Sequence, residues 1–156
     1  MTTDPGTSQA ASGKPPPVWM IRAMTSVHKF LRTLTGGRGF NSLGGDDVCF
    51  VKMMGAKSGR ELTVPLMYVP YEDGVLLVAS QGGNPKNPLW YHNLVKNPDI
   101  SVEHRGKHLL LRARLASSAE KAALWPICDQ YYAPFANYRR FTDRDIPIFV
   151  CEPRES

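Results

Sequence analysis

The residues best suited to chemistry occupy positions 80–91, which read Ser-Gln-Gly-Gly-Asn-Pro-Lys-Asn-Pro-Leu-Trp-Tyr. Because they follow the apolar run at residues 75–79, we expect a buried strand that opens into a glycine-rich loop. Glycines let backbone N–H groups approach a ligand closely, Lys86 supplies positive charge, and Trp90 with Tyr91 offers a flat apolar wall. This combination favours a ligand in which a flat ring is attached to a phosphate.

A second glycine-rich segment, residues 55–60, carries Lys57, Ser58 and Arg60. It lies between two predicted strands, where its paired glycines permit a tight turn that directs several donors at one anion. It is not a Walker A loop, because the G-x-x-x-x-G-K-[ST] spacing is absent and no helix is predicted to follow. A charged hairpin turn is usually only solvated. The presence of another cationic glycine loop, the one at residues 80–91 that holds Lys86, strengthens the interpretation of residues 55–60 as a phosphate site.

Metal and nucleophile chemistry find little support in the sequence. His104 and His108 flank a predicted turn, but no cysteine or carboxylate lies at ligand spacing beside them, so we expect no metal site. No G-x-S-x-G motif occurs, which argues against acyl transfer. Cys49, Cys128 and Cys151 form neither a C-x-x-C pair nor an even disulfide framework, which predicts reduced and mostly buried thiols.

Aromatic residues crowd the segment from Tyr131 to Phe141. Tyr132 is part of this cluster, and the spacing of Tyr131, Phe135 and Tyr138 is typical of an apolar helical face. Tyrosine hydroxyls allow a second interpretation, because a buried hydroxyl needs a partner. Several of them above a flat ligand could donate hydrogen bonds or a proton to a reducible substrate.

The composition is that of one soluble globular domain, with 156 residues, 42% apolar and 21% charged. No run of about 18 apolar residues occurs and the N-terminus lacks the apolar core of a secretory signal, so we expect a cytoplasmic protein. The formal net charge of +5 is concentrated near the N-terminus, since no acidic residue lies between Asp4 and Asp46. Such a balance suits nucleic acid, an anionic membrane surface or an anionic small molecule, and the charge alone does not choose among them.

Three segments are predicted along the chain. Residues 1–17 are rich in Pro, Ser, Thr and Gly and form a disordered tail, and residues 18–38 form a basic amphipathic helix. Residues 43–156 form a mainly β domain of about six antiparallel strands closed into a small barrel. The predicted strands are residues 48–54, 62–69, 75–80, 100–103, 109–115 and 146–151. A short helical turn starts near Trp90, and Ser117 with Glu120 has the capping-box spacing of a longer helix that Pro126 bends or interrupts.

Several separated motifs together resemble those of the deazaflavin-dependent nitroreductase family of actinobacteria. The match runs from about residue 43 to residue 153. Its most specific parts are Gly55-x-Lys57-Ser58-Gly59, Pro65-Leu66, Ala79-Ser80, Lys86-Asn87-Pro88-x-Trp90-Tyr91-x-Asn93-Leu94, Trp125-Pro126 and Thr142-Asp143-Arg144-x-Ile146-Pro147-Ile148. The resemblance implies a split β-barrel, similar to FMN-binding barrels, that uses coenzyme F420.

The resemblance further implies a two-electron reductase that passes hydride from reduced deazaflavin to quinones, activated enones or nitroaromatic compounds. The implied catalytic residues are Ser80, Tyr132 and Tyr138. The implied coenzyme-binding residues are Ala56, Lys57, Ser58, Gly59, Arg60, Leu62, Thr63, Val64, Pro65, Leu66, Ala79, Ser80, Gln81, Lys86, Trp90, Tyr91 and Asn93. Positioning of the hydride donor near the acceptor should supply much of the catalysis.

The chain departs from the family pattern at four positions. Many members have arginine where this chain has Ala56 and Leu62, and some have lysine in place of Gln81. We therefore expect the oligoglutamate tail of the coenzyme to be bound more loosely or by different cations. Of three tyrosines that surround the substrate in a nitroimidazole-reducing relative, the middle one is Phe135 here. We therefore expect quinone or enone reduction to persist and reduction of bicyclic nitroimidazoles to be weak.

The sequence is compatible with other functions. An FMN-dependent oxidoreductase on the same barrel, or a non-catalytic F420 carrier, would also explain a phosphate site beside an apolar ring slot. The helix at residues 18–38 either packs on the barrel or contacts the inner face of the cell membrane. A nucleic-acid partner is disfavoured, because the basic residues gather on one helix and no reader motif occurs.

Overall fold

The computed structural model describes residues 42–43 and 46–155. The predicted tail at residues 1–17 and the predicted amphipathic helix at residues 18–38 lie outside these ranges. Within the part of the chain that the structure describes, no helix is both long and apolar enough to cross a membrane.

The described residues are mainly β, as predicted. The strands are β1 (Ser42–Leu43), β2 (Asp46–Met54), β3 (Glu61–Met67), β4 (Val69–Tyr71), β5 (Gly74–Val78), β6 (Asp99–His104), β7 (Lys107–Leu115) and β8 (Ile148–Pro153). The helices are the 3-10 helix η1 (Gln81–Gly83) and the α-helices α2 (Leu89–Lys96), α3 (Ser118–Tyr131) and α4 (Pro134–Arg140). Eight strands therefore replace the six predicted, because β1 is an additional short strand and the predicted strand at 62–69 divides at Tyr68 into β3 and β4.

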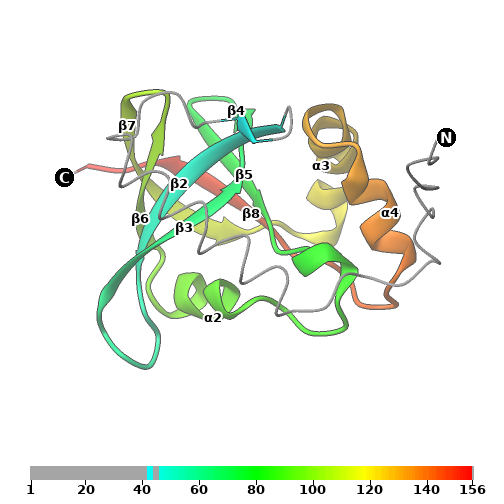
Figure 1. Cartoon of the computed structure of the whole chain (residues 1–156), viewed down its shortest axis with the longest axis horizontal. Helices are drawn as coiled ribbons and strands as arrows, with labels where there is room; N and C mark the ends of the chain where they lie inside the picture. The colour runs from blue at the N-terminus through cyan, green and yellow to red at the C-terminus, as the bar shows by residue number, and fades with distance from the viewer. Residues whose placement is uncertain (1–41, 44–45, 156) are drawn as a thin grey trace, which may run out of the picture.

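The strands form one antiparallel sheet in the order β1-β2-β6-β7-β8-β5-β4, with β3 paired to β2. The predicted closure into a barrel is wrong, since no ladder among the described strands joins β4 to β1 or β3. Pro65 in β3 and Pro70 in β4 have no backbone N–H to donate, which is typical of edge strands and explains why the sheet stays open there. Figure 1 shows α3 and α4 gathered at one side of the twisted sheet and α2 beneath it.

Alternating side chains of the central strands build two hydrophobic cores. On one face, Val75 and Leu77 of β5 pack with Trp90 and Leu94 of α2. On the other face, the intervening Leu76 and Val78 of β5 pack with residues of α3 and α4. The strand β5 is thus buried on both faces, which confirms the interpretation of its continuous apolar run.

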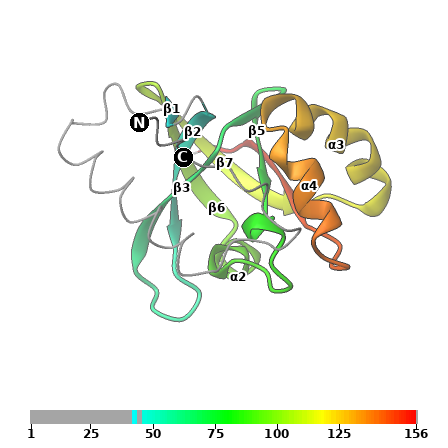
Figure 2. The ribbon, with the colours of Figure 1, turned by 45° about the vertical axis from the view of Figure 1, so that its right-hand side comes forward.

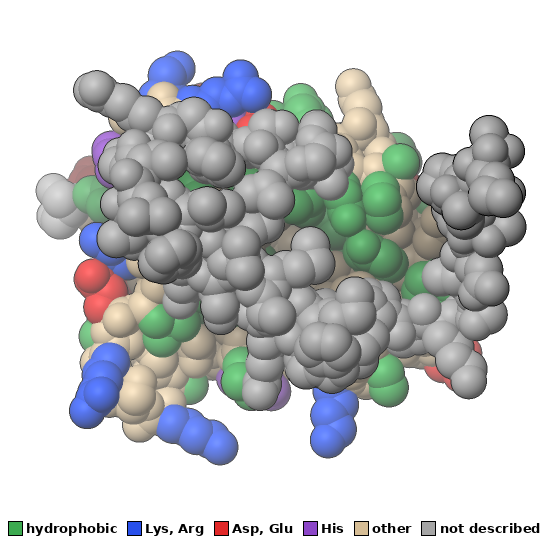
Figure 3. Space-filling view, in the orientation of Figure 1, with side chains coloured by type: hydrophobic (Ala, Val, Ile, Leu, Met, Phe, Trp, Pro, Cys, Tyr) green, Lys and Arg blue, Asp and Glu red, His purple; other side chains and the backbone are tan. Residues whose placement is uncertain are grey.

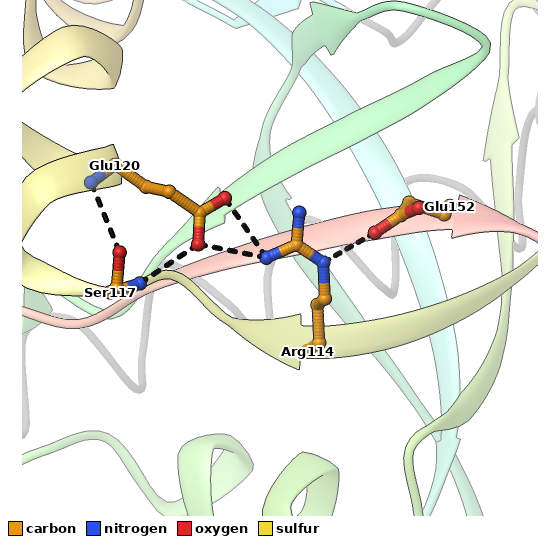
Figure 4. A network of polar contacts seen from close by, with 4 residues as sticks. All are labelled: Arg114, Ser117, Glu120 and Glu152. Atoms are coloured by element: carbon orange, nitrogen blue, oxygen red, sulfur yellow. Dashed lines mark hydrogen bonds and ion pairs between the residues drawn. The ribbon is translucent and has the colours of Figure 1, made fainter.

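The N-terminus of α3 is tied to the sheet by a polar network (Figure 4). Ser117 Oγ accepts a hydrogen bond from Glu120 N at 3.2 Å and Ser117 N donates to Glu120 Oε1 at 3.1 Å, so the predicted capping box is confirmed. Arg114 of β7 donates to both carboxylate oxygens of Glu120 and to Glu152 of β8. The helix continues through Pro126 to its end at Tyr131, so the predicted interruption is not observed.

All three cysteines are free and buried, as predicted. Burial raises the pKa of Cys49 and of Cys128 to about 12, and it raises the pKa of Cys151 as well. Because the thiolate is the reactive form, these side chains behave as small apolar groups and have no part in the chemistry below.

Candidate functional site

The turn between β2 and β3, residues 55–60, has the compact geometry that its glycines predict. Gly55 N donates to Arg60 O at 2.8 Å, and Gly59, whose φ is +64°, donates to Gly55 O at 3.0 Å. Lys57, Ser58 and Arg60 are exposed. Among the described residues, the backbone N–H groups of Lys57 and Ser58 have no acceptor, so this turn presents free donors and cationic side chains together.

Helix α2 holds this turn in place. Asn93 Oδ1 accepts a hydrogen bond from Ala56 N at 2.8 Å, and Asn93 Nδ2 lies 3.7 Å from Met53 Sδ. Lys96 Nζ donates to Ala56 O at 2.7 Å. Both ends of the Asn93 amide are therefore engaged with the protein. Asn93 was predicted to bind the coenzyme, and its geometry is that of a support for the turn.

The loop after β5 is the second predicted ligand-binding segment. Three successive residues, Gln81, Gly82 and Gly83, have positive φ values of 45°, 63° and 78°. A Cβ atom added at Gly83 would lie 2.6 Å from Tyr138 O, so the loop approaches α4 more closely than any other residue type permits. Ser80 is 8% exposed, whereas Ala79 is completely buried and belongs to the core.

Arg144 anchors this loop from beneath, although the sequence prediction assigned it no role. Its Nη1 donates to Ala79 O at 3.1 Å, its Nη2 donates to Ser80 O and Asn84 O at 2.9 Å each, and its Nε donates to Asn84 O at 3.1 Å. Nη1 also donates to Asn87 Oδ1. The only sequence signal was the position of Arg144 within a motif shared with the resembled family.

The β2–β3 turn and the loop after β5 lie at the same end of the molecule, with α2 beside both (Figures 1 and 2). Lys and Arg side chains protrude along this edge in the space-filling view of Figure 3. Lys57, Arg60 and Lys86 are exposed, and none pairs with a carboxylate within the described part of the chain. The structure therefore brings the two predicted cationic loops to one end of the sheet.

The residues predicted on β3 divide between its two faces. Leu62 and Val64 lie opposite Met53 and Val51 of β2, and they are partly buried against the first core together with Leu66. Thr63 and Pro65 point to the other face, because side chains alternate along a strand. A single ligand could contact all five residues only through their backbone.

Trp90 and Tyr91 differ in position although they are adjacent. Trp90 is 8% exposed and its ring lies 5.9 Å from the ring of Phe149, so the indole is part of the core. Tyr91 lies 5.6 Å from the same phenylalanine but is only half-buried. Of the predicted aromatic wall, Tyr91 keeps a surface for a ligand and Trp90 supports it from within.

Tyr132, which directly follows α3, and Tyr138 of α4 form a second polar feature. The hydroxyl oxygens of Tyr132 and Tyr138 lie 3.0 Å apart, and the ring of Phe135, which is 3% exposed, packs edge-on against Tyr132. Arg139 fixes this arrangement, because its guanidinium binds the carboxylate of Asp129 at 2.7 and 2.8 Å and lies 4.1 Å from the ring centre of Trp125. The predicted pair of hydroxyls is thus held in mutual contact.

The family of the chain follows from its match to a family model. Residues 21–153 match the model of the F420H(2)-dependent quinone reductases. The chain belongs to this family. A F420H(2)-dependent quinone reductase of Mycobacterium tuberculosis is 33% identical over 132 residues, which are 82% of this chain and 89% of the relative. A second M. tuberculosis protein, assigned to the same type of reductase, is 40% identical over 98 residues, or 63% of this chain and 82% of its own.

Solved structures agree with membership of the quinone reductase family. The structure of an F420-H2 dependent reductase is 41% identical, has a TM-score of 0.62, and is matched over 67% of this chain and 93% of its own. Another, described as a domain-swapped dimer, is 35% identical with a TM-score of 0.65, over 88% of this chain and 100% of its own. The resemblance inferred from the sequence motifs is therefore confirmed, and so is F420 as the coenzyme of the family.

The geometry of the two loops fits the coenzyme that the quinone reductase family uses. Reduced F420 joins a flat ring to an anionic tail, and it needs cations and donors at one end of a site and an apolar surface at the other. The β2–β3 turn offers Lys57 and Arg60 with free backbone donors. Beside it, Leu62 and Val64 of β3 and the half-buried ring of Tyr91 offer apolar surface.

Proposed function

We propose that this chain binds reduced F420 between its two glycine-rich loops and reduces a quinone. The observation that carries the proposal is the placement of both loops beside α2, with exposed cations that no described carboxylate neutralises. When bound, the coenzyme supplies the hydride. The protein orients the ring and the acceptor and keeps water away from them.

The roles of individual residues follow their places in the fold. Lys57, Ser58 and Arg60 bind the anionic tail, because their turn presents both cations and backbone donors. Ser80 and Gln81 line the ring from the loop after β5, and Lys86 adds charge at the exposed end of that loop. Tyr132 and Tyr138 contact the acceptor and assist its protonation through their paired hydroxyls.

The simplest test is to mix purified protein with oxidised F420 and follow the coenzyme's fluorescence, then to supply reduced F420 and menadione. We expect quenching that saturates, followed by turnover. Tightly bound flavin in the purified protein would instead favour the FMN-dependent alternative, and saturable binding without turnover would favour a carrier.

Bicyclic nitroimidazoles should react more slowly than menadione, since Phe135 has no hydroxyl. Equal rates would contradict this acceptor range, and enones provide a further comparison.

The role of the β2–β3 turn is tested by Lys57→Ala. We expect the KM for reduced F420 to rise about tenfold with kcat changed less, because a charge contact to the tail contributes mainly to binding. Lys107→Ala provides a control, since Lys107 is an exposed lysine at the turn between β6 and β7. Equal effects of the two substitutions would show that only net charge matters.

We further propose that residues 18–38 place the protein on the anionic inner face of the cell membrane, where lipid-soluble quinones are found. Arg22, Lys29 and Arg32 carry the positive charge of this segment. Replacing all three by Glu should abolish co-sedimentation with anionic liposomes but should leave turnover of menadione, a quinone without a lipid tail, unchanged in the absence of liposomes. Co-sedimentation that survives the triple substitution would remove the membrane proposal.

A further inference from the structure

Arg144 is unusual because, within the described part of the chain, all the hydrogen bonds of its side chain go to one loop, residues 79–87. Its guanidinium donates to three backbone carbonyls, those of Ala79, Ser80 and Asn84, and to the side chain of Asn87. In the described part of the chain it pairs with no carboxylate. Burial lowers the pKa of Arg144, but a guanidinium remains charged in proteins. A positive charge is therefore held directly beneath the loop.

The carbonyl contacts fix the direction of two peptide groups. A trans peptide places its N–H opposite its C=O, and the described residues contain no cis peptide. Because the carbonyls of Ala79 and Ser80 point at Arg144, the N–H groups of Ser80 and Gln81 point away from it. Neither N–H has an acceptor among the described residues, although Ser80 is 8% exposed. Ser80 is buried, whereas Gln81 is half-buried. Because buried N–H groups are normally paired, the unpaired donor of Ser80, with that of Gln81 beside it, supports a ligand at this loop.

We propose that Arg144 is the positioning residue of the loop after β5, and that it aims the backbone N–H groups of Ser80 and Gln81 at the carbonyl oxygens of a bound flat heterocycle. This role rests on the proposed function, which supplies that heterocycle. Arg144 acts through the loop and does not itself contact the ligand.

The same contacts couple the two loops. Asn87 lies just before α2, and α2 holds the β2–β3 turn through Asn93 and Ala56. By binding Asn87, Arg144 connects the loop after β5 to α2, the helix that supports the β2–β3 turn. Loss of Arg144 should therefore weaken the binding of both the ring and the tail.

The principal test is Arg144→Lys, which keeps the charge but loses the planar fork that reaches several carbonyls at once. We expect the Kd for oxidised F420 and the KM for reduced F420 to rise about tenfold, as when one or two ligand hydrogen bonds are misaligned. The KM for menadione should stay unchanged. A general structural defect would alter both KM values.

Arg154→Lys is the matched control. Arg154 is also half-buried and also donates to backbone carbonyls, at 3.0 Å to Leu111 O and 3.4 Å to Ile100 O, but on strands away from the loop. We expect a fall in melting temperature similar to that of Arg144→Lys with no change in F420 affinity.

Two further measurements keep the proposal testable if Arg144→Lys folds poorly. Asn87→Ala removes one acceptor of Arg144 and should raise the Kd about threefold. In the double variant, the increase in Kd should be less than the combined increases of the two single variants, because both substitutions remove the same contact between Arg144 and Asn87. Without any coenzyme, amide hydrogen exchange across residues 79–87 should be faster in either variant and unchanged in Arg154→Lys.

The possible failures are distinguishable. A wild-type protein that binds no F420 would overturn the proposed function together with the ligand assigned to this loop. Wild-type binding that Arg144→Lys or Asn87→Ala leaves unaltered would overturn the positioning role alone. Exchange at residues 79–87 that is the same in all variants would also overturn it.

Discussion

Tyr132 and Tyr138 form a hydroxyl–hydroxyl contact beside the core between β5 and the helices α3 and α4. Apolar packing of the two rings would not require this contact. Their hydroxyl oxygens lie 3.0 Å apart at the junction of α3 and α4, and Phe135 occupies the position between them without a hydroxyl. Each hydroxyl can orient the proton of the other, because a hydroxyl both donates and accepts. A pair of this kind can present one O–H to a reducible acceptor.

We expect Tyr132→Phe and Tyr138→Phe each to lower kcat for menadione about tenfold, which corresponds to the loss of one hydrogen bond in the transition state. The double variant should be little slower than either single variant, because both substitutions break the same contact. Steady-state kinetics with saturating reduced F420 would measure this. Tyr131→Phe serves as the control, since Tyr131 is adjacent but 47% exposed. Fully multiplicative effects would show that the hydroxyls act independently.

At the scale of elements, the loop after β5, which we propose lines the coenzyme ring, closely approaches α4, the helix that carries Tyr138. Gly83 combines a φ of +78° with backbone atoms of Tyr138 so near that a methyl group would not fit. Gly106, in the turn between β6 and β7, has a similar φ of +81° but nothing within 4 Å of an added Cβ. A substitution at Gly106 therefore tests backbone strain alone, whereas a substitution at Gly83 tests backbone strain together with a steric clash.

Both Gly83→Ala and Gly106→Ala should lower the free energy of unfolding by about 1–2 kcal/mol through the left-handed backbone alone. Gly83→Ala should cost more, because the loop or α4 must also shift, and it should weaken F420 binding while Gly106→Ala leaves binding unchanged. Urea unfolding and fluorescence titration would give the two quantities. Equal losses of stability, together with intact F420 binding in Gly83→Ala, would mean that the loop moves at no cost to the site.

For the whole molecule, the helical layer is joined to the sheet by polar contacts at the start of α3. Hydrogen bonds from Ser117 N and from Arg114 hold the pKa of Glu120 below its ordinary value. A carboxylate whose pKa is lower in the folded protein stabilises folding above its unfolded pKa, about 4.3, and this stabilisation is lost as the pH falls through the folded pKa. The attachment of α3 should therefore weaken in acid.

Glu120→Gln should lower the free energy of unfolding at pH 7. It should also make that free energy fall less steeply as the pH is lowered below about 4.3. Chemical unfolding measured between pH 3 and pH 7 would test this, with Glu155→Gln as a control at an exposed glutamate for which no ion pair is found among the described residues. The Arg114–Glu120 contact is solvent-exposed, so added salt should reduce the difference from wild type. An acid limb that is equally steep in Glu120→Gln would show that other carboxylates control it.

Local patterns predicted the features that depend on neighbouring residues. The alternation in β5, the capping box of Ser117 and Glu120, and the glycine turn at residues 55–60 each involve groups a few positions apart, and all appear in the structure. The family that the motifs indicated was also confirmed, because the order of motifs along the chain is itself a property of the sequence.

Long-range contacts explain what could not be predicted. Arg144 binds carbonyls 60 to 65 positions earlier in the chain, and Asn93 holds Ala56 across 37 positions. No pattern within a strand or a helix specifies such pairs. Trp90 shows the same limit, since only the packing of α2 on β8 decides that its indole belongs to the core while Tyr91 stays at the surface.

The sequence by itself therefore determined the family, the mainly β class, the reduced thiols and the residue types of two cationic loops. Only the tertiary structure decided that these loops lie beside one helix, that the sheet stays open at β3 and β4, and that Arg144 supports the loop after β5. The physical reason is that backbone conformation responds to near neighbours, whereas the convergence of side chains depends on how distant strands and helices pack together.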